Sequence, residues 1–263
     1  LNLVRAVRRS GKYEEQTLAL PRGPLGDGTH DLVVRVSLVG DEGLIAILVF
    51  DDSEFHRLDS MRRDFVANIS HELKTPIGAL SILAEAVLEA SDDPTAIKKF
   101  ASRMQLEAKR LTDLVQEIIN LSRLQDSDPL QIASENVVLE LINEAVDLVK
   151  TTSEAKGISV SISEIPNVTV LGDGDQLIMA IHNLLENAIN YSPNNTNVSI
   201  SSSIEDDIIE IVVTDQGIGI PESELDRIFE RFYRVDPARS RETGGTGLGL
   251  SIVKHVASKH GGE

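Results

Sequence analysis

The sequence contains no cysteine and no tryptophan, and only nine of its 263 residues are aromatic. Without cysteine the chain can form neither disulfides nor thiolate metal sites, so we expect a reducing compartment. The shortage of aromatic rings argues against stacking platforms for single-stranded nucleic acid. Basic residues are also few, 25 against 42 acidic ones, and the net charge of −17 excludes a nucleic-acid binder that relies on bulk positive charge.

Long hydrophobic runs are missing as well. The longest purely apolar run is Leu44–Phe50, far short of the roughly 20 residues of a membrane helix, so we expect this stretch of chain to be soluble. With 41% apolar residues a core can still form, and the length suggests about two domains with the remnant of a third. Because the chain opens on Leu1 and stops at Gly-Gly-Glu, we expect it to be cut from a longer protein.

The negative charge is unevenly distributed. Residues 1–53 and 54–126 each carry a net charge of −2, whereas residues 127–263 hold 22 acidic and 9 basic residues, a net −13. This contrast indicates a domain boundary near the polar loop Gln125–Pro129.

The first segment predicts β-structure. Apolar residues favour strands over Leu32–Leu38 and Leu44–Phe50, with the turn Gly40–Gly43 between them. Because two strands and a hairpin cannot bury a core alone, we interpret this segment as the end of a domain whose beginning is missing.

The middle segment predicts a helical hairpin. The pattern is helical from about Ser53 to Ser91, and Asp92-Asp93-Pro94 marks a compact break with a proline in the first turn of the next helix. Apolar residues then recur at three- and four-residue spacing as far as Leu121, interrupted only by Glu107. Two helices leave such a stripe uncovered, so we expect dimerisation into a four-helix bundle.

The last segment predicts a mixture of helices and mostly antiparallel strands, so the expected fold class is α+β with several domains. Helices are expected at Leu139–Lys150, Asp175–Asn190 and Gly249–His260, and strands at Ser159–Ile162, Asn197–Ser203 and Ile208–Asp215.

The sharpest local motif is Ser70-His71-Glu72-Leu73-Lys74-Thr75-Pro76. It is not a zinc-protease motif, because Thr75 stands where a second histidine would be needed. A histidine followed by an acid, with a hydroxyl one turn later, suits a nucleophilic imidazole whose ring proton Glu72 can hydrogen-bond during attack. Pro76 would bend the helix nearby. Since a histidine in a helix is more often structural, the hypothesis depends on the motifs downstream.

Two further motifs suit a nucleotide. Asn183 and Asn187 stand at i and i+4, which puts two amide oxygens on one helix face. Such oxygens suit Mg²⁺ held together with phosphates, although exposed asparagines are usually solvated. Asp215 follows an apolar strand and can accept a hydrogen bond from an exocyclic amine, while Gly217 and Gly219 let a ligand approach the backbone. The alternative for the second motif is a plain glycine-rich turn.

Phosphate binding is indicated near the end of the chain. Five arginines fall between residues 227 and 241, around and after the aromatic run Phe229–Tyr233. The glycine-rich stretch Gly244–Leu250 then opens the last predicted helix, where backbone amides and a helix N-terminus make an anion site. It has neither the Lys-Ser/Thr pair of a Walker loop nor the βαβ setting of a dinucleotide fingerprint.

Together and in this order, the motifs resemble the sensor histidine kinases of two-component systems, over roughly residues 55–263. The matching segments are His71 for the H-box, Asn183–Pro193 for the N-box, Asp215–Pro221 for the G1 box, Phe229–Tyr233 for the F-box and Gly245–Leu250 for the G2 box. Among the branches of the family the sequence is most similar to phosphate-regulon sensors.

The resemblance implies three domains. Residues 1–52 would be the tail of a PAS-like sensor domain, and residues 53–126 the dimerisation and histidine-phosphotransfer hairpin. Residues 127–263 would be an ATP-binding catalytic domain of the Bergerat (GHKL) type, an α/β sandwich. Family members normally continue past His-Gly-Gly with strands that close the sheet, so we expect this domain to be less stable or to be truncated.

The resemblance also implies the chemistry at the acceptor. His71 would take the γ-phosphoryl group of ATP and pass it to an aspartate of a response regulator. Glu72 would assist this transfer, and Thr75 would orient water for dephosphorylation of the regulator.

For the nucleotide, the resemblance implies that Asp215 reads the adenine amine and Tyr191 packs near adenine or ribose. Asn187, helped by Asn183, would hold Mg²⁺, and Arg234 would approach the terminal phosphates. Residues 235–247 would form a lid. The remaining ATP-binding residues would be Gly217, Gly219, Gly245, Gly247, Leu248 and Gly249. Asn190 departs from the family, which often has Lys or Arg there for a phosphate contact.

The implied partners are a second copy of the chain, bound through the hairpin, and a receiver domain, without nucleic acid. The full-length protein would sit on the cytoplasmic side of the bacterial membrane, attached through segments outside this sequence. Two other functions stay open: a GHKL ATPase that drives conformational change, and an inactive dimeric scaffold. Surface or structural roles are expected for the other histidines, His30, His56, His182, His255 and His260.

Overall fold

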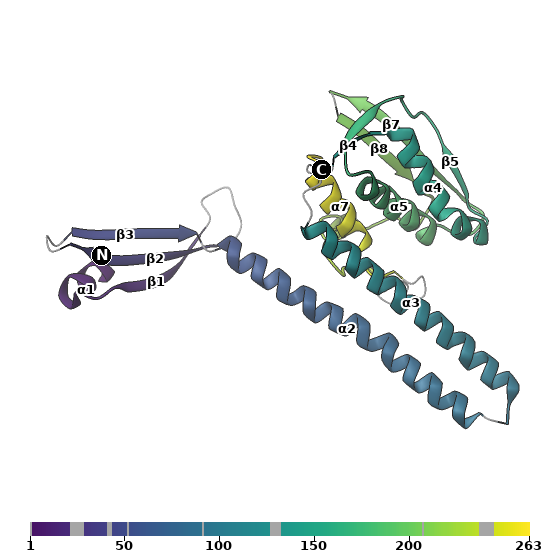
Figure 1. Ribbon diagram of the computed structural model, residues 1–263, viewed down its shortest axis with the longest axis horizontal. Coiled ribbons are helices and arrows are strands. Elements are labelled where there is room, and N and C mark those ends of the chain that lie inside the picture. The colour runs from purple at the N-terminus through teal and green to yellow at the C-terminus, as the bar shows by residue number, and fades with distance from the viewer. Residues whose placement is uncertain are drawn as a thin grey trace. The chain divides into compact units, whose positions relative to one another are not determined.

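The N-terminal residues form a three-stranded antiparallel sheet with a helix against it. The computed structural model describes residues 2–21, 29–40, 44–51, 53–90, 92–126, 133–206, 208–236 and 245–263. Helix α1 (Asn2–Ser10) precedes strands β1 (Glu14–Pro21), β2 (Thr29–Val39) and β3 (Leu44–Asp51), with β2 in the centre (Figure 1). Val7 of α1 and Val36 of β2 are buried, so a small core lies between helix and sheet.

The two strands expected in this segment are confirmed, but α1 and β1 were not predicted. Helix α1 places Leu3 and Val7 on one face, but with nine residues it is too short for its pattern to stand out, and β1 alternates only weakly. With them the segment buries more than a bare hairpin could. Gly40 begins the expected turn at a φ of +65°, and residues 41–43 of that turn lie outside the described residues.

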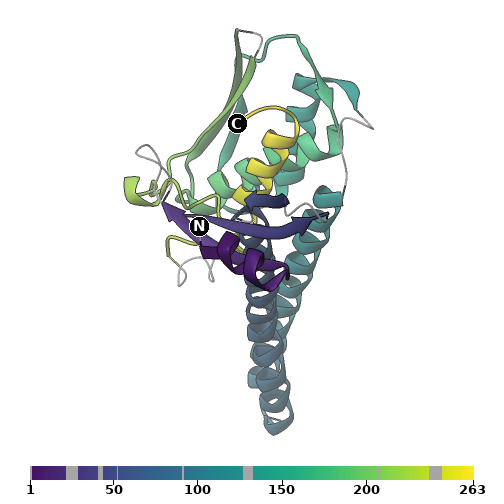
Figure 2. The same ribbon diagram turned by 90° about the vertical axis from the view of Figure 1, so that its left-hand side faces the viewer.

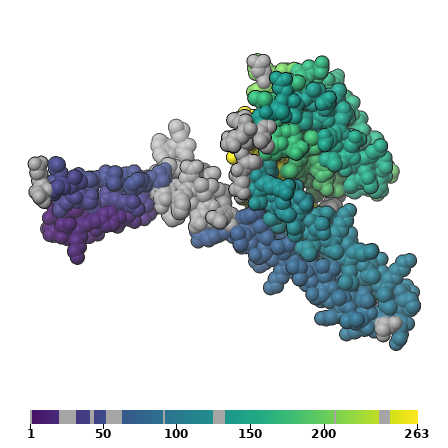
Figure 3. All heavy atoms as spheres, in the orientation of Figure 1, coloured from purple at the N-terminus to yellow at the C-terminus, as the bar shows by residue number. Residues whose placement is uncertain are grey.

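The predicted hairpin consists of two long antiparallel helices, α2 (Ser53–Glu89) and α3 (Pro94–Asp126) (Figure 1). Helix α2 runs on through Pro76. Asp93 caps α3 with its Oδ1, which accepts hydrogen bonds from the amides of Thr95 at 2.9 Å and Ala96 at 3.1 Å. The turn end of the hairpin stands clear of the C-terminal helices and strands on the face shown in Figure 3. By compactness the chain divides into Leu1–Ser70 and His71–Glu263, so α2 passes from one unit into the other.

The C-terminal part is an α/β sandwich, as predicted. Its helices are α4 (Val138–Ala155), α5 (Gly174–Tyr191) and α7 (Gly249–Lys259), with the short 3₁₀ helix η2 (Glu222–Glu224). Its strands are β4 (Ser134–Val137), β5 (Ser159–Ile162), β6 (Thr169–Gly172), β7 (Asn197–Glu205) and β8 (Ile208–Thr214). In the order β5-β7-β8, β5 runs parallel and β8 antiparallel to β7, while β4 pairs antiparallel with β6. The helices lie on one side of these strands (Figures 1 and 2).

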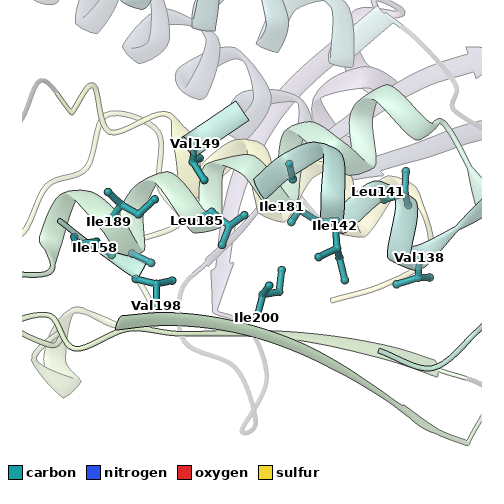
Figure 4. Close-up of a cluster of buried hydrophobic side chains, with 12 residues drawn as sticks. Val138, Leu141, Ile142, Val149, Ile158, Ile181, Leu185, Ile189, Val198 and Ile200 are labelled. Atoms are coloured by element: carbon teal, nitrogen blue, oxygen red, sulfur yellow. The ribbon is translucent and has the colours of Figure 1, made fainter. Parts of the chain in front are cut away.

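The main core lies between α4, α5 and the sheet. Val198 and Ile200 alternate with serines along β7 and turn toward Ile142 and Leu185 of the helices (Figure 4). All four side chains are fully buried. Burial of such a side chain stabilises the fold by about 1.5–3 kcal/mol relative to exposure. This core holds α5, which carries both asparagines of the predicted metal site, firmly against the sheet.

Strands β4 and β6 were not predicted, because neither Ser134–Val137 nor Thr169–Gly172 alternates polar and apolar residues, as the equally short β5 does. The other expected elements of this domain are present with ends shifted by a few residues.

The apolar stripe of the hairpin is only partly uncovered. Val66, Ile82 and Leu88 are exposed within one chain, in keeping with a seam for a second copy. Leu114, Leu121 and Leu124 of α3, by contrast, are already buried within this chain. Helix α7 packs against α3, and the Nε2 of His255 lies 3.2 Å from the carbonyl oxygen of Leu124. The expectation that dimerisation covers the stripe therefore needs correction for this end of α3. Here α7 of the same chain contributes to covering it.

Candidate functional site

The predicted phospho-acceptor His71 lies on the exposed surface of α2. One turn later, the Thr75 hydroxyl donates a hydrogen bond to the His71 carbonyl oxygen at 3.3 Å. Such bonds from threonine to the preceding turn are common in helices and fix the hydroxyl against the backbone. His71 is thus accessible, and the Thr75 hydroxyl is held against the backbone of that residue.

Glu72, next to the acceptor, is joined to the opposite end of the sequence. Its Oε2 accepts a hydrogen bond from Nη2 of Arg234 at 2.8 Å, and the same Nη2 lies 2.9 Å from the carbonyl oxygen of Thr246. The Arg234 side chain is only 9% exposed, and its Nε is buried without a hydrogen-bond partner among the described residues. The structure therefore brings the predicted phosphate-binding arginine to the residue beside the predicted acceptor.

The asparagines of α5 face the glycine-rich loop. Helix α5 begins after Asp173, whose side chain accepts hydrogen bonds from two first-turn amides. Nδ2 of Asn183 donates to the Met179 carbonyl at 2.8 Å, so Oδ1 is the atom of this amide that faces Gly249. A Cβ on Gly249 would lie 2.8 Å from that Oδ1 and 3.7 Å from Nδ2 of Asn187. The close approach requires glycine, and it joins the two predicted motifs in one place.

Asp215 stands directly after β8, as predicted. The amide of Gly217 donates a 2.6 Å hydrogen bond to Oδ1 of Asp215, and a Cβ on Gly217 would lie 3.1 Å from the carbonyl oxygen of Tyr191. These three predicted nucleotide residues are therefore neighbours. Gly219 has a φ of +72°, but nothing lies within 4 Å of the position of its Cβ, so it serves the turn and makes no close contact.

The aromatic run packs on the glycine-rich loop. The amide of Phe232 donates to the carbonyl oxygen of Gly247 at 2.8 Å, and Gly247 has a φ of +79°. The guanidinium of Arg227 lies 4.2 Å from the ring centre of Tyr233, whose hydroxyl donates to Glu224. Gly245 and Leu248 lie on either side of Gly247 in the sequence, and Leu248 is fully buried. Of the predicted lid, residues 237–244 lie outside the described residues, with two of the five arginines.

Two residues of the site were missed by sequence reasoning. The Thr246 hydroxyl donates to the carboxylate of Glu117 on α3, and its Oγ1 accepts from the amide of Leu248 at 3.2 Å. Burial raises the pKa of the Glu117 carboxyl to about 7, and the hydrogen bond from Thr246 opposes that increase. Thr246 lies within a recognised motif, but no local pattern marks Glu117, because its partners come from distant parts of the chain.

Two of the other histidines, His255 and His260, make structural contacts. The amide of Asp173 donates to Nε2 of His260 at 3.1 Å, and Nδ1 of His260 lies 2.9 Å from the Val256 carbonyl oxygen. Within the described ranges, no three His, Cys, Asp or Glu side chains gather as metal ligands. Nor does any helix in those ranges have the length and hydropathy to cross a membrane.

Two families match separate parts of the chain. Residues 61–127 match the His Kinase A (phospho-acceptor) domain, and residues 172–263 match the histidine kinase-, DNA gyrase B- and HSP90-like ATPase. The first range contains the helical hairpin with His71, and the second contains α5, Asp215 and the glycine-rich loop.

Similar proteins are named sensor kinases. The chain is 50% identical to the sensor-like histidine kinase SenX3 of Mycolicibacterium smegmatis over 87% of its own length and 60% of SenX3. It is 32% identical to the phosphate regulon sensor protein PhoR of Pseudomonas aeruginosa, over 98% of the chain and 59% of PhoR. The chain thus spans about 60% of the length of these relatives.

The fold matches a solved structure of histidine kinase ThkA in complex with the response regulator protein TrrA, with a TM-score of 0.63 at 19% identity. The match covers 99% of this chain and 76% of that one. At this identity the likeness concerns the fold alone. With both domains matched by family, the chain carries the phospho-acceptor and ATPase domains of histidine kinases and comprises a kinase portion of the two-component type.

Proposed function

We propose that this chain uses ATP to phosphorylate His71 and then passes the phosphoryl group to an aspartate of a response regulator. The ion pair between Glu72 and Arg234 carries the proposal. It brings a guanidinium suited to phosphate to the residue next to an exposed histidine, although the two lie 162 residues apart in sequence. The domain bounds 1–52, 53–126 and 127–263 are part of this proposal.

The residues present fit a nucleotide. A Cβ at Gly217 or Gly249 would crowd Tyr191 or Asn183, so glycine at these positions lets the two predicted nucleotide motifs pack closely on α5. The buried Nε of Arg234 has no partner among the described residues, an arrangement that costs about 1–3 kcal/mol and that an anion near the guanidinium can offset. We assign Asp215 to adenine and Arg234 to the terminal phosphates.

The donor set also fits Mg²⁺. The side-chain hydrogen bond of Asn183 to the Met179 carbonyl uses Nδ2 and does not involve Oδ1. Asn187 lies one turn away on the same face. Because Mg²⁺ keeps several waters and phosphate oxygens, it needs few protein ligands. Asn187 and Asn183 would hold the ion, which would supply neutralising charge to the phosphates.

In the proposed reaction, one ring nitrogen of neutral His71 attacks the γ-phosphorus of ATP. The bond to the leaving oxygen of ADP breaks as the nitrogen–phosphorus bond forms. The proton on the other ring nitrogen is stabilised by the Glu72 carboxylate. The phosphoryl group then moves to a carboxylate of the receiver domain. In the opposing phosphatase activity, Thr75 orients the water that dephosphorylates the regulator.

The alternative functions have less support. A GHKL ATPase would need the ATP-binding motifs but not a phospho-acceptor hairpin, and residues 61–127 match such a hairpin. An inactive scaffold would not need an arginine held beside Glu72.

The partners are proposed on similar grounds. Exposed apolar residues on the hairpin support a homodimer, with Ile82 68% and Leu88 77% exposed. A receiver domain as partner is supported by ThkA, which was solved together with a response regulator. Membrane association of the whole protein is proposed from the sensor kinases that this chain resembles.

The test is labelling of the purified chain with γ-labelled ATP and Mg²⁺. We expect a label that is lost in acid and stable in base, and that His71→Gln abolishes while His182→Gln retains it. Label that persists in His71→Gln, or that survives acid, contradicts the histidine kinase. Full ATP hydrolysis without any labelled protein favours the ATPase.

A further inference from the structure

Four side chains form one polar cluster where the hairpin meets the ATP-binding domain. Glu72 and Glu117 come from α2 and α3, and Arg234 and Thr246 come from the aromatic run and the glycine-rich loop. The cluster is continuous, because Arg234 donates to the Glu72 carboxylate and to the Thr246 carbonyl, while the Thr246 hydroxyl donates to Glu117. Each helix of the hairpin thus makes one charged contact with the nucleotide-binding side.

Thr246 connects the glycine-rich loop to α3 within this cluster. Its hydroxyl oxygen also accepts the amide of Leu248 at 3.2 Å, so one residue closes a turn within the loop and attaches that loop to α3. Thr246 is only 9% exposed, which shields these bonds from competing water. Loss of Glu117 would release the loop from α3 but leave the turn inside the loop intact.

We propose that Glu117 is a positioning residue for phosphoryl transfer: by accepting the Thr246 hydrogen bond it fixes the nucleotide-binding loop on the hairpin, which keeps Arg234 at Glu72 beside the phospho-acceptor. The inference rests on the proposed kinase function. It assigns to α3 a part in the reaction that none of the recognised motifs includes.

The charges around Glu117 agree with a protein-facing role. Burial is the largest cause of the raised pKa of the Glu117 carboxyl, and the nearby charges of Glu186 on α5 and Asp113 on α3 raise that pKa further. Thr246 and Arg234 lower it. A carboxylate beside two other acids would repel a triphosphate. Glu117 is therefore suited to hold the loop and not to touch the nucleotide.

The kinetic test separates positioning from binding. Glu117→Ala should lower kcat of autophosphorylation by about tenfold to a hundredfold, because small displacements of reacting groups cost this much. KM for ATP should change less than about threefold, since the loop keeps its internal turn. Thr246→Val loses both bonds and should affect kcat and KM together. The Glu117→Ala change should then add little in the Thr246→Val background.

Two controls keep the test specific. Glu117→Gln retains a side-chain oxygen that accepts the Thr246 hydroxyl and should restore kcat to within about threefold of the unmodified chain. Glu107→Ala removes a glutamate from the same helix whose 2.9 Å ion pair with Arg110 lies inside α3. A loss in Glu117→Ala no greater than in Glu107→Ala, a raised KM at unchanged kcat, or a Gln variant as impaired as the Ala variant would each overturn the proposal.

Hydrogen exchange tests the docking without relying on kinase activity. The amides of residues 245–249 should exchange faster in Glu117→Ala than in Glu107→Ala or Glu117→Gln. Equal exchange in all three refutes the docking. If the unmodified chain takes no label while the exchange differs as expected, the proposed function fails and the docking stands.

Discussion

The raised pKa of Glu117 makes stability depend on pH, and Glu117→Gln should remove that dependence. A carboxyl whose pKa is higher in the folded state binds its proton more tightly there. It therefore favours folding fully below its ordinary pKa of 4.5, and this contribution is lost as the pH rises through about 7. Glutamine has no such proton, so the variant should be stabilised relative to the unmodified chain as the pH increases.

The magnitude follows from the two pKa values. The increase from 4.5 to about 7 corresponds to about 3.5 kcal/mol, at about 1.4 kcal/mol for each pH unit. Most of this, about 2.5 kcal/mol, should appear between pH 5 and pH 8. It is an upper value, because the loop can detach from α3 and let the ionised carboxylate reach water.

The assay is urea unfolding of both proteins at several values between pH 5 and pH 8.5, followed through the unfolding of the ATP-binding domain. The difference in unfolding free energy between Glu117→Gln and the unmodified chain should grow with pH and level off above pH 8. Glu107→Gln makes the same chemical change on the same helix and serves as the control. A difference that stays constant across this range, or that shrinks as the pH rises, refutes the burial of Glu117 against the loop.

Three further predictions concern single positions. Gly247→Ala should cost about 1–3 kcal/mol and weaken ATP binding in calorimetry, because a Cβ at its φ of +79° would lie 2.8 Å from the backbone of Phe232; Gly261→Ala, at +78° in open space, isolates the backbone term. Lys156→Met should cost about 1–2 kcal/mol in urea unfolding, since its Nζ donates to the carbonyls of Ile189 and Asn190 at 2.8 and 2.9 Å, and Lys150→Met is the control. Thr75→Ala should slow regulator dephosphorylation about tenfold or more and spare autophosphorylation; equal loss of both activities would remove the role given to Thr75.

Local patterns were sufficient for most of the secondary structure. A helical pattern predicted the first helix of the hairpin and heptad spacing the second, and alternation along residues 197–203 predicted the strand whose apolar face forms the core. Strands β4 and β6 were missed because neither alternates polar and apolar residues, and each is stabilised by pairing with the other across the 31 residues 138–168. Element ends near Asp215 and Gly249 were predicted within one residue, since an acid after a strand and glycines before a helix mark such ends.

The candidate site was predictable where chemistry needs a residue type at a fixed local spacing. The His-Glu pair, the two asparagines one turn apart and the glycine-rich loop at a helix start all have this property. How they assemble was not predictable from spacing. The meeting of Asn183 with Gly249 depends on the packing of α5 against α7, and that packing depends on the whole core.

The sequence by itself thus indicated the two kinase domains, the hairpin, a candidate acceptor histidine and the candidate nucleotide motifs, because helical periodicity and motif chemistry depend on neighbouring residues. Only the tertiary structure decided that Arg234 lies on Glu72 and that Glu117 holds Thr246. These partners are 162 and 129 residues apart, and single acids or hydroxyls on a helix surface carry no local signal of what they will meet. Such contacts exist only after the hairpin and the ATP-binding domain have packed together, and burial in that packing is also what changes the proton affinity of Glu117.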